Sequence, residues 1–236
     1  MSRRLLLLLA SACVTLSAGG ALVAQSEEAE RVQKAAGVFD EIMAARDKAV
    51  PDAVLQKAEA IVVFPGTIKA GLGIGGHRGK GIMSARDRTN NRWSSPAFLT
   101  LTGGSFGAQI GAEQIDLVLV VMNKEGVDHL IGNEFKIGGD ASVAAGPVGR
   151  GAEASTDAQL RAQILSYSRA RGLFAGVSLV GSAIREDEDA NQRFYGRALR
   201  NREIVAPTQT AVGTTGSETA PAAVRTWHQT LAKYVK

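Results

Sequence analysis

Cysteine is almost absent from this 236-residue sequence: the single one, Cys13, lies in an N-terminal segment spanning residues 1–24. In this segment two arginines precede a short apolar run that ends in small residues, which is the pattern of a secretory signal peptide. Cleavage is expected after Ala24, or else after Ala21, and either cut removes Cys13. A mature chain without cysteine excludes disulfides, a thiol nucleophile and thiolate metal ligands. Attachment of a lipid to Cys13 is the alternative.

The sequence also has few histidines and a small net charge. The three histidines, His77, His129 and His228, show no spacing that would pair metal ligands, so neither a metal site nor a cofactor is expected. The formal net charge is only +4, and two of the arginines belong to the signal peptide. Such a chain is not expected to bind nucleic acid. Attraction to an anionic surface would have to come from a local basic patch.

The sequence also lacks fixed-period repeats of solenoid length, and the apolar run of the signal peptide is too interrupted to span a membrane. The length suits a single domain over residues 25–236. Residues 206–220, rich in Thr, Gly and Ala, are expected to form a flexible loop within it. What the chain has in excess is glycine, with 27 residues concentrated between positions 66 and 181.

Helices are expected near both ends of the chain. Apolar residues at helical spacing predict an amphipathic helix over residues 26–49, a short helix over 51–60 and a terminal helix from Pro221. An acidic start followed by "ANQRFYG" predicts another short helix, which ends at Gly196. We expect the first of these helices to pack on the sheet, because its polar face carries few cations, unlike a membrane-surface helix.

Between residues 67 and 181, short apolar stretches bounded by glycine predict many short strands. Pro65-Gly66 predicts a turn before them, and "RARG" at 169–172 predicts a tight hairpin. The predicted fold class is therefore α+β: a curved, mainly antiparallel, Gly-rich sheet or partial barrel flanked by N- and C-terminal helices.

The glycines at Gly71, Gly73 and Gly76 match the spacing of dinucleotide-binding loops. Such a loop must open a helix, whose N-terminal amides bind the pyrophosphate. Here Gly79 and Gly81 would fall in the first turns of that helix and destabilise it. Gly71, Gly73 and Gly75 instead alternate with Leu72 and Ile74, which predicts a strand with one bare face that another backbone can approach closely. No nucleotide cofactor is expected.

Ser105, in "GGSFG", matches the nucleophile elbow of serine hydrolases. The elbow requires a helix directly after the serine, but a short stretch containing Gly111 leads straight into an apolar strand. Of the histidines that follow, His129 lies in an amphipathic turn and His228 lies beside Trp227 on the predicted terminal helix. An esterase that uses Ser105 is therefore the weakest of three functional hypotheses, and no catalytic residue is expected.

Several motifs in order resemble one known family. They are "AIVVFPGTIKAGLGIGGHRGKGIMSARD", "RWSSPAFLTLTGGSFGAQIGAEQIDLVLVVMN", "GGDASVAAGPVGRGAEASTDAQLRAQILSYSRARGLFAGVSLVGS" and "NQRFYG". Together they resemble the SYLF domain, also called the yeast-type actin-binding domain family, over about residues 30–236. The resemblance implies a lipid-binding module without catalytic residues, because eukaryotic members bind phosphoinositides and membranes. Fungal members also bind actin.

For an exported protein the resemblance and the signal peptide together predict a non-enzymatic module that binds an anionic phospholipid or membrane surface. We expect it in the periplasm or at the cell surface, peripherally associated with the membrane. Actin is not an expected partner of an exported bacterial member. The alternative is a structural or protein-interaction module with a protein partner in the envelope.

Basic residues near turns are the candidate head-group contacts, because the arginine fork matches phosphate geometry. The candidate contacts, which include Trp93 as an aromatic anchor, are Lys69, Arg78, Lys80, Arg86, Arg88, Arg92, Trp93, Arg150, Arg169 and Arg171. The alternative for each cation is a solvated turn residue paired with a carboxylate of the chain itself. Trp93 could equally be an interfacial anchor or packed core.

Overall fold

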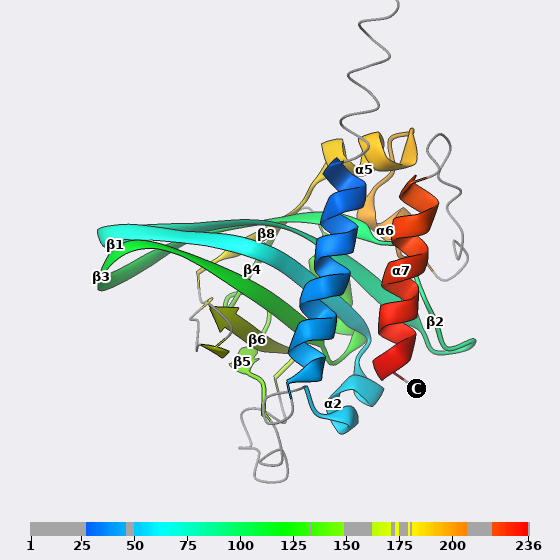
Figure 1. Cartoon of the computed structure of the whole chain (residues 1–236), viewed down its shortest axis with the longest axis horizontal. Helices are drawn as coiled ribbons and strands as arrows, with labels where there is room; N and C mark the ends of the chain where they lie inside the picture. Colours follow the sequence, from blue (N-terminus) through cyan, green and yellow to red (C-terminus); the bar gives the residue numbers. More distant parts are fainter. Residues whose placement is uncertain are drawn as a thin grey trace, which may run out of the picture.

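The computed structural model of the protein (Figure 1) describes residues 27–45, 50–132, 134–148, 162–170, 173–174, 179, 181–206 and 219–235. The predicted signal peptide with Cys13 and most of the predicted loop at 206–220 lie outside these residues.

The described elements are short helices and strands around two very long strands. The N-terminal helix spans residues 27–44. The others are α2 (Asp52–Lys57), β1 (Ala60–Asp87), β2 (Arg92–Trp93), β3 (Ala97–Val121), α3 (Lys124–Leu130), β4 (Glu134–Lys136), β5 (Val143–Ala145), β6 (Ile164–Ala170), β7 (Leu173–Phe174), β8 (Ala183–Glu186), α5 (Glu188–Tyr195), α6 (Asn201–Ile204) and α7 (Thr219–Tyr234).

The strands β1 and β3, of 28 and 25 residues, pair with each other over nearly their whole length. Their antiparallel register runs from Ala60 opposite Val121 to Met83 opposite Ala97. The separate short strands that the glycine pattern predicts between residues 98 and 123 are therefore wrong. Glycine weakens a strand but does not end it while both neighbours remain hydrogen-bonded to a partner.

The β1–β3 ribbon folds back on itself. The register shifts between Leu72 and Ile74, which marks the bend. A Cβ atom at Gly81 would lie 2.4 Å from the carbonyl oxygen of Val63, although an extended strand would hold these residues about 60 Å apart. A Cβ at Gly79 would similarly lie 2.5 Å from the Thr67 hydroxyl. Glycine at these two positions therefore lets the two legs of β1 approach closely. The predicted strand through Gly71, Gly73 and Gly75 is confirmed, while a close approach at those three glycines stays a prediction.

The two legs of β3, residues 99–102 and 115–121, each pair with further strands. One leg pairs with β6, which pairs in turn with β5 and β7, and the other leg pairs with β8 and then β4. All these pairs are antiparallel except β5–β6. The result is a curled half-barrel of eight described strands, and the predicted α+β class with a curved, mainly antiparallel sheet is confirmed. β6 and β7 form the hairpin predicted at 169–172.

The helices cover one end of the curl, and the bent ribbon extends beyond them at the other end (Figure 1). Phe39 of the N-terminal helix packs edge-on against Trp227 of α7, with ring centroids 6.0 Å apart. The Trp227 indole N–H donates to the Ser84 hydroxyl of β1 at 2.9 Å. Phe194 of α5 packs against Phe98 of β3. The predicted docking of the terminal helices on the sheet is confirmed.

The predicted end of the short helix at Gly196 was also correct, whereas the predicted role of Pro51 was not. The Asp187 carboxylate accepts from the Ala190 N–H at the start of α5, and Gly196 adopts the left-handed conformation at its end. Pro51 is the N-cap of α2 and not its first helical residue. Among the described helices, none has the length and apolar character of a membrane span.

The Pro65-Gly66 pair does not form the predicted turn. β1 continues through it as a bulge, with two residues opposite Asp116 alone. Gly66 has a φ of 61°, and its N–H donates to the Asp116 carboxylate at 2.9 Å. A side chain 50 positions away therefore holds this conformation.

Candidate functional site

One face of the sheet, between the bend and the helices, is uncovered. The strand register places two rows of side chains on it: Arg78, Thr102, Ala183 and Lys136, then Lys80, Thr100, Arg185 and Glu134. Residues in register share a face, and the four strands span about 14 Å. Leu101, Ile184 and Phe135 lie between the rows and are buried on the opposite face. We call Arg78, Lys80, Lys136 and Arg185 the basic face.

Three of these cations are electrostatically uncompensated. Arg78, Lys80 and Lys136 are exposed, and their side chains make no ion pair or hydrogen bond with any residue that the structure describes. The Arg185 guanidinium lies 2.9 Å from the Glu134 carboxylate, yet its side chain remains 53% exposed. Within its two rows the basic face therefore presents four cations and one carboxylate to solvent, and the Asp140 carboxylate lies at its edge, where it accepts from the Lys136 backbone N–H at 2.6 Å.

An open hollow lies on the basic face next to the bend. Its lining includes Arg78, Lys136 and Thr102, together with Ile68 of the other leg of β1 and the buried His77. Two cations, a hydroxyl and an apolar side chain are therefore brought together at one concave place, with Glu134 as the single carboxylate of the lining. Such a lining suits an anionic group attached to an apolar body better than it suits a small polar substrate.

His77 lies beneath this hollow in a buried polar contact. Its Nε2 atom lies 2.7 Å from the hydroxyl oxygen of Ser182, and both residues are buried. Burial lowers the pKa of His77, and the nearby Lys69 ammonium lowers it further. Both effects favour the neutral form of the imidazole.

The other predicted contacts in the first hairpin lie at the opposite end of β1. The Arg86 guanidinium donates to Asn91 and lies 5.9 Å from the ring centroid of Trp93, which is only 7% exposed. Trp93 is therefore packed core. The Arg88 guanidinium lies 2.9 Å from the Glu59 carboxylate and also donates to backbone carbonyls.

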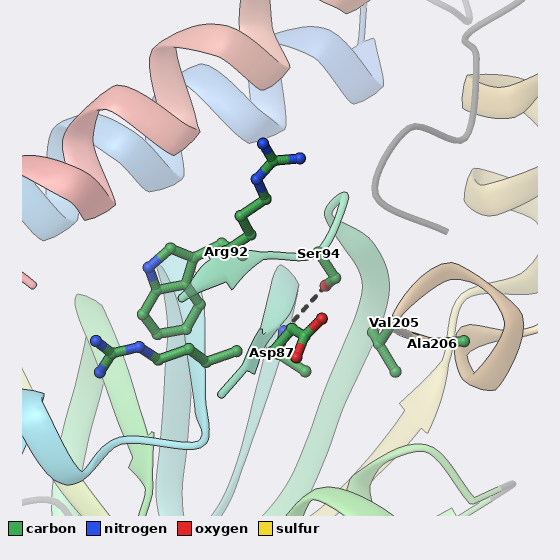
Figure 2. A pocket seen from close by; sticks show the side chains of 8 residues that line it. Asp87, Arg92, Ser94, Val205 and Ala206 are labelled. Atoms are coloured by element: carbon green, nitrogen blue, oxygen red, sulfur yellow. Dashed lines mark hydrogen bonds between the residues drawn. The ribbon is translucent and has the colours of Figure 1, made fainter. Parts of the chain in front are cut away.

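Next to Trp93 is a cavity of about 20 Å³ (Figure 2). Its lining includes Asp87, Ser94, Val205 and Ala206. A space of this size holds one water molecule and no lipid head group. Figure 2 shows the Arg92 side chain extending away from Asp87, and Arg92 is exposed without a side-chain partner among the described residues.

The structure therefore separates the predicted contacts. Arg78 and Lys80 lie on the basic face, while Arg86, Arg88, Arg92 and Trp93 lie at the β1–β2 end. Arg169 is held by two carboxylates, those of Glu41 and Asp116. Arg150 and Arg171 lie outside the described residues.

Two members of the basic face, Lys136 and Arg185, are absent from the sequence-based candidates. They lie on the short strands β4 and β8, and only the pairing of β4, β8 and β3 brings them beside Arg78. The available signal was the alternation in "EFK" and "AIRE", where a buried residue lies beside an exposed cation.

The structural context of the catalytic and cofactor motifs is missing. Ser105 lies inside the continuous strand β3, opposite Gly75, so no helix follows it. Gly71, Gly73 and Gly76 lie inside β1, so they do not open a helix as a dinucleotide-binding loop does. Within the described residues no group of three or more His, Cys, Asp or Glu side chains is placed to hold a metal ion.

Comparison with known families gives a match over residues 102–234 to the Ysc84 family, described as Las17-binding protein actin regulator. The chain belongs to the Ysc84, or SYLF, family. The match includes the β3 half of the bent ribbon, β4, β8 and the C-terminal helices, and the resemblance identified from the sequence motifs is confirmed.

Individual members of the SYLF family are similar to the chain. Protein YSC84 of Saccharomyces cerevisiae is 36% identical over 165 residues, which are 68% of this chain and 34% of the yeast protein. LAS seventeen-binding protein 3 of the same yeast is 37% identical over 155 residues, 64% of this chain and 33% of that protein. The SH3 domain-containing YSC84-like protein 1 of Mus musculus is 34% identical over 181 residues, 75% of this chain and 53% of that protein.

The chain thus spans between a third and about half of the length of these relatives. Membership of the SYLF family supports a non-enzymatic binding module. The basic face is the surface of the described residues that best fits such a role.

Proposed function

We propose that the chain is a non-enzymatic module that binds anionic phospholipid surfaces of the cell envelope through its basic face. The observation that carries the proposal is the gathering of Arg78, Lys80, Lys136 and Arg185 from four strands onto one uncovered face with a single carboxylate. The adjoining hollow adds an apolar wall at Ile68. Export to the periplasm or cell surface is part of the proposal and rests on the signal-peptide pattern of residues 1–24.

The expected binding is weak and reversible. Each basic side chain near an anionic bilayer contributes about 1 kcal/mol, so four of them contribute about 4 kcal/mol at most. The attraction fades with salt, because the Debye length falls from about 30 Å at 0.01 M to about 3 Å at 1 M.

The test is co-sedimentation with vesicles of phosphatidylglycerol and phosphatidylcholine in equal parts, compared with phosphatidylcholine alone. We expect binding to the anionic vesicles at low salt, weaker binding to them at high salt, and little binding to neutral vesicles. Replacing Arg78 and Lys80 together (Arg78→Ala/Lys80→Ala) should lower the partition coefficient about ten- to thirtyfold, because two of the four contributions are lost.

The matched control removes two exposed arginines from the helical end, Arg197→Ala/Arg202→Ala. It changes the net charge equally and should leave binding within about twofold of the parent, because these residues lie away from the basic face. Arg200 is unsuitable for this control, because its guanidinium pairs with Glu186 and Glu188. Absence of low-salt binding, or equal losses in both variants, would overturn the proposal.

A second candidate is a protein partner with an acidic surface. It is favoured by the relatives, one of which is named a LAS seventeen-binding protein and whose family is described as an actin regulator. Retention of an acidic protein by the parent, but not by the Arg78→Ala/Lys80→Ala variant, in the absence of any vesicle binding would select it.

A further inference from the structure

We infer that the bend of the β1–β3 ribbon inserts into the upper part of the bilayer to which the basic face binds. The bend comprises residues 68–76 of β1 and 104–112 of β3. This inference rests on the proposed function and adds a second, apolar attachment to the electrostatic one. It assigns a role to the exposed end of the fold, which the basic face alone does not explain.

The composition of the bend is apolar and nearly free of charge. Its large apolar residues are Ile68, Leu72, Ile74, Phe106 and Ile110. Lys69 is its one charged residue, and the exposed Glu113 lies opposite Lys69 at the border of the bend on β3. The backbone register places Leu72 opposite Ile110 and Ile74 opposite Phe106, one pair on each side of the register shift. Four large apolar residues distant in sequence are thereby brought together at one place in the fold.

The bend is also the part of the sheet that other elements leave uncovered. Figure 1 shows the ribbon extending past the remaining strands and away from the helices. Ile68 is 58% exposed, the most exposed large apolar side chain among the described residues. Ala70, Gly76, Gly104 and Ala112 are exposed as well. A projecting tip can enter a planar surface without a clash between that surface and the body of the protein.

The charges behind the bend complement an anionic bilayer. Arg78 follows Ile74 by four residues, or about 13 Å along an extended strand. The head-group layer is about 5–7 Å thick on each side of the hydrocarbon core. Arg78 can therefore remain among the head groups while the bend reaches the acyl chains.

Backbone hydrogen bonding limits how deep the bend can go. β1 and β3 satisfy each other along their shared edge. Among the described strands, the outer edge of β1 pairs only with β2, near residues 86–87. An unpaired strand edge is not tolerated in the hydrocarbon core, where water is absent. Insertion is therefore shallow, about 5–10 Å below the head-group boundary, as for other interfacial segments.

The experiment places a fluorescent probe at the tip by Phe106→Trp, an exchange of one aromatic residue for another. The protein's own Trp93 and Trp227 are 7% and 0% exposed, which shields them from quenchers in the lipid. With vesicles of equal parts phosphatidylglycerol and phosphatidylcholine, lipids brominated near the top of the acyl chain should quench the Phe106→Trp emission strongly. The parent, and a Thr100→Trp variant on the basic face, should be quenched weakly or not at all.

A second pair of variants tests the energetic role. Ile74→Ser/Phe106→Ser should leave low-salt binding to anionic vesicles detectable but lower the salt-resistant fraction about tenfold or more. Ile68→Ser, at an exposed position that should not disturb folding, should lower it less, in the same direction. Equal circular dichroism spectra and unfolding midpoints establish that the variants are folded.

The outcomes separate the two proposals. If the parent binds anionic vesicles but Phe106→Trp is not quenched and the serine variants bind like the parent, insertion is overturned and the basic-face function stands. If the parent binds no vesicles at low salt, both proposals are overturned. Strong quenching together with loss of salt-resistant binding in the serine variants supports insertion.

Discussion

The Nε2 atom of His77 lies 2.7 Å from the hydroxyl oxygen of Ser182, a residue 105 positions away, and both side chains are buried. The contact depends on a glycine opposite the histidine. A Cβ atom at Gly103 would lie 2.4 Å from His77 Nε2 and 2.7 Å from the Ser182 oxygen. The polar pair thus joins β1 to the segment before β8 in the space that a missing side chain leaves on β3.

This contact predicts a pH dependence of stability. Burial lowers the pKa of His77 in the folded state below its ordinary value, so the unfolded chain binds the proton more readily. The free energy of unfolding should therefore be greatest above pH about 6.5 and fall as the pH drops, until the pH passes below the folded-state pKa. Chemical denaturation at several pH values measures it.

Histidine is scarce enough to make this test specific, because carboxylates titrate mostly below this window. His77→Gln, whose amide can replace the imidazole nitrogen opposite Ser182, should flatten the profile between pH about 5.5 and 7.5. His129→Gln, at a half-buried position on α3, is the control and should keep the slope. A slope that persists unchanged in His77→Gln would contradict the assignment.

Gly81→Ala and Gly37→Ala should change the free energy of unfolding in opposite directions, because only Gly81 lies where the two legs of β1 approach closely. Gly81→Ala places its Cβ 2.4 Å from the Val63 carbonyl oxygen, a backbone atom that cannot rotate away. The expected loss is about 2–3 kcal/mol of unfolding free energy, as for other overpacked cores. Gly37→Ala, in the N-terminal helix with nothing within 4 Å, should instead stabilise the protein, by about 0.5–1 kcal/mol. A neutral Gly81→Ala would show that the legs are not in contact.

Features determined by nearby residues were predictable from the sequence. The acidic start and Gly196 delimit α5 as expected, and Trp227 and Leu231 face the core from α7. The sequence also predicted that glycine lets backbones approach closely, and the structure shows such an approach at Gly79 and Gly81.

The continuity of the long strands was not predictable, because a local pattern cannot distinguish a bulge from a turn. Gly66 is held by Asp116, a residue 50 positions away, and no local signal contains that information. For the same reason, only two of the four cations of the basic face could be predicted from the sequence. Arg78 and Lys80 alternate on one strand, whereas Lys136 and Arg185 join them only through the pairing of β3, β8 and β4.

Asn191 links α5 to β3 and to α6 inside the core. Its side-chain oxygen accepts from the Phe98 N–H at 3.0 Å, and its amide donates to the Asn201 side chain at 2.8 Å. Asn191→Ala leaves both partners buried and unsatisfied, so we expect a loss of about 2–4 kcal/mol in unfolding free energy. Gln192→Ala, exposed on the same helix, should change stability by less than about 0.5 kcal/mol. Similar midpoints for the two variants would rule out this role.

Glu28 and Glu30, two residues apart on the N-terminal helix, test how burial changes the contribution of an ion pair to the free energy of unfolding. The Glu28 side chain is 0% exposed, and one of its oxygens accepts from two nitrogens of Arg193 at 3.1 and 2.9 Å. Glu30 pairs with Lys34 at 2.8 Å, but their side chains are 60% and 62% exposed.

Glu28→Ala should therefore cost about 1.5–3 kcal/mol of unfolding free energy, the range for hydrogen bonds to a charged group. Arg193 is partly exposed, so water hydrates it after the loss and keeps the cost below that of a fully buried pair. Glu30→Ala should change stability by less than about 1 kcal/mol, because solvent screens an exposed pair. A double-mutant cycle with Arg193→Ala isolates the coupling, and a coupling energy near zero would mean that Glu28 stabilises the helix end by other contacts.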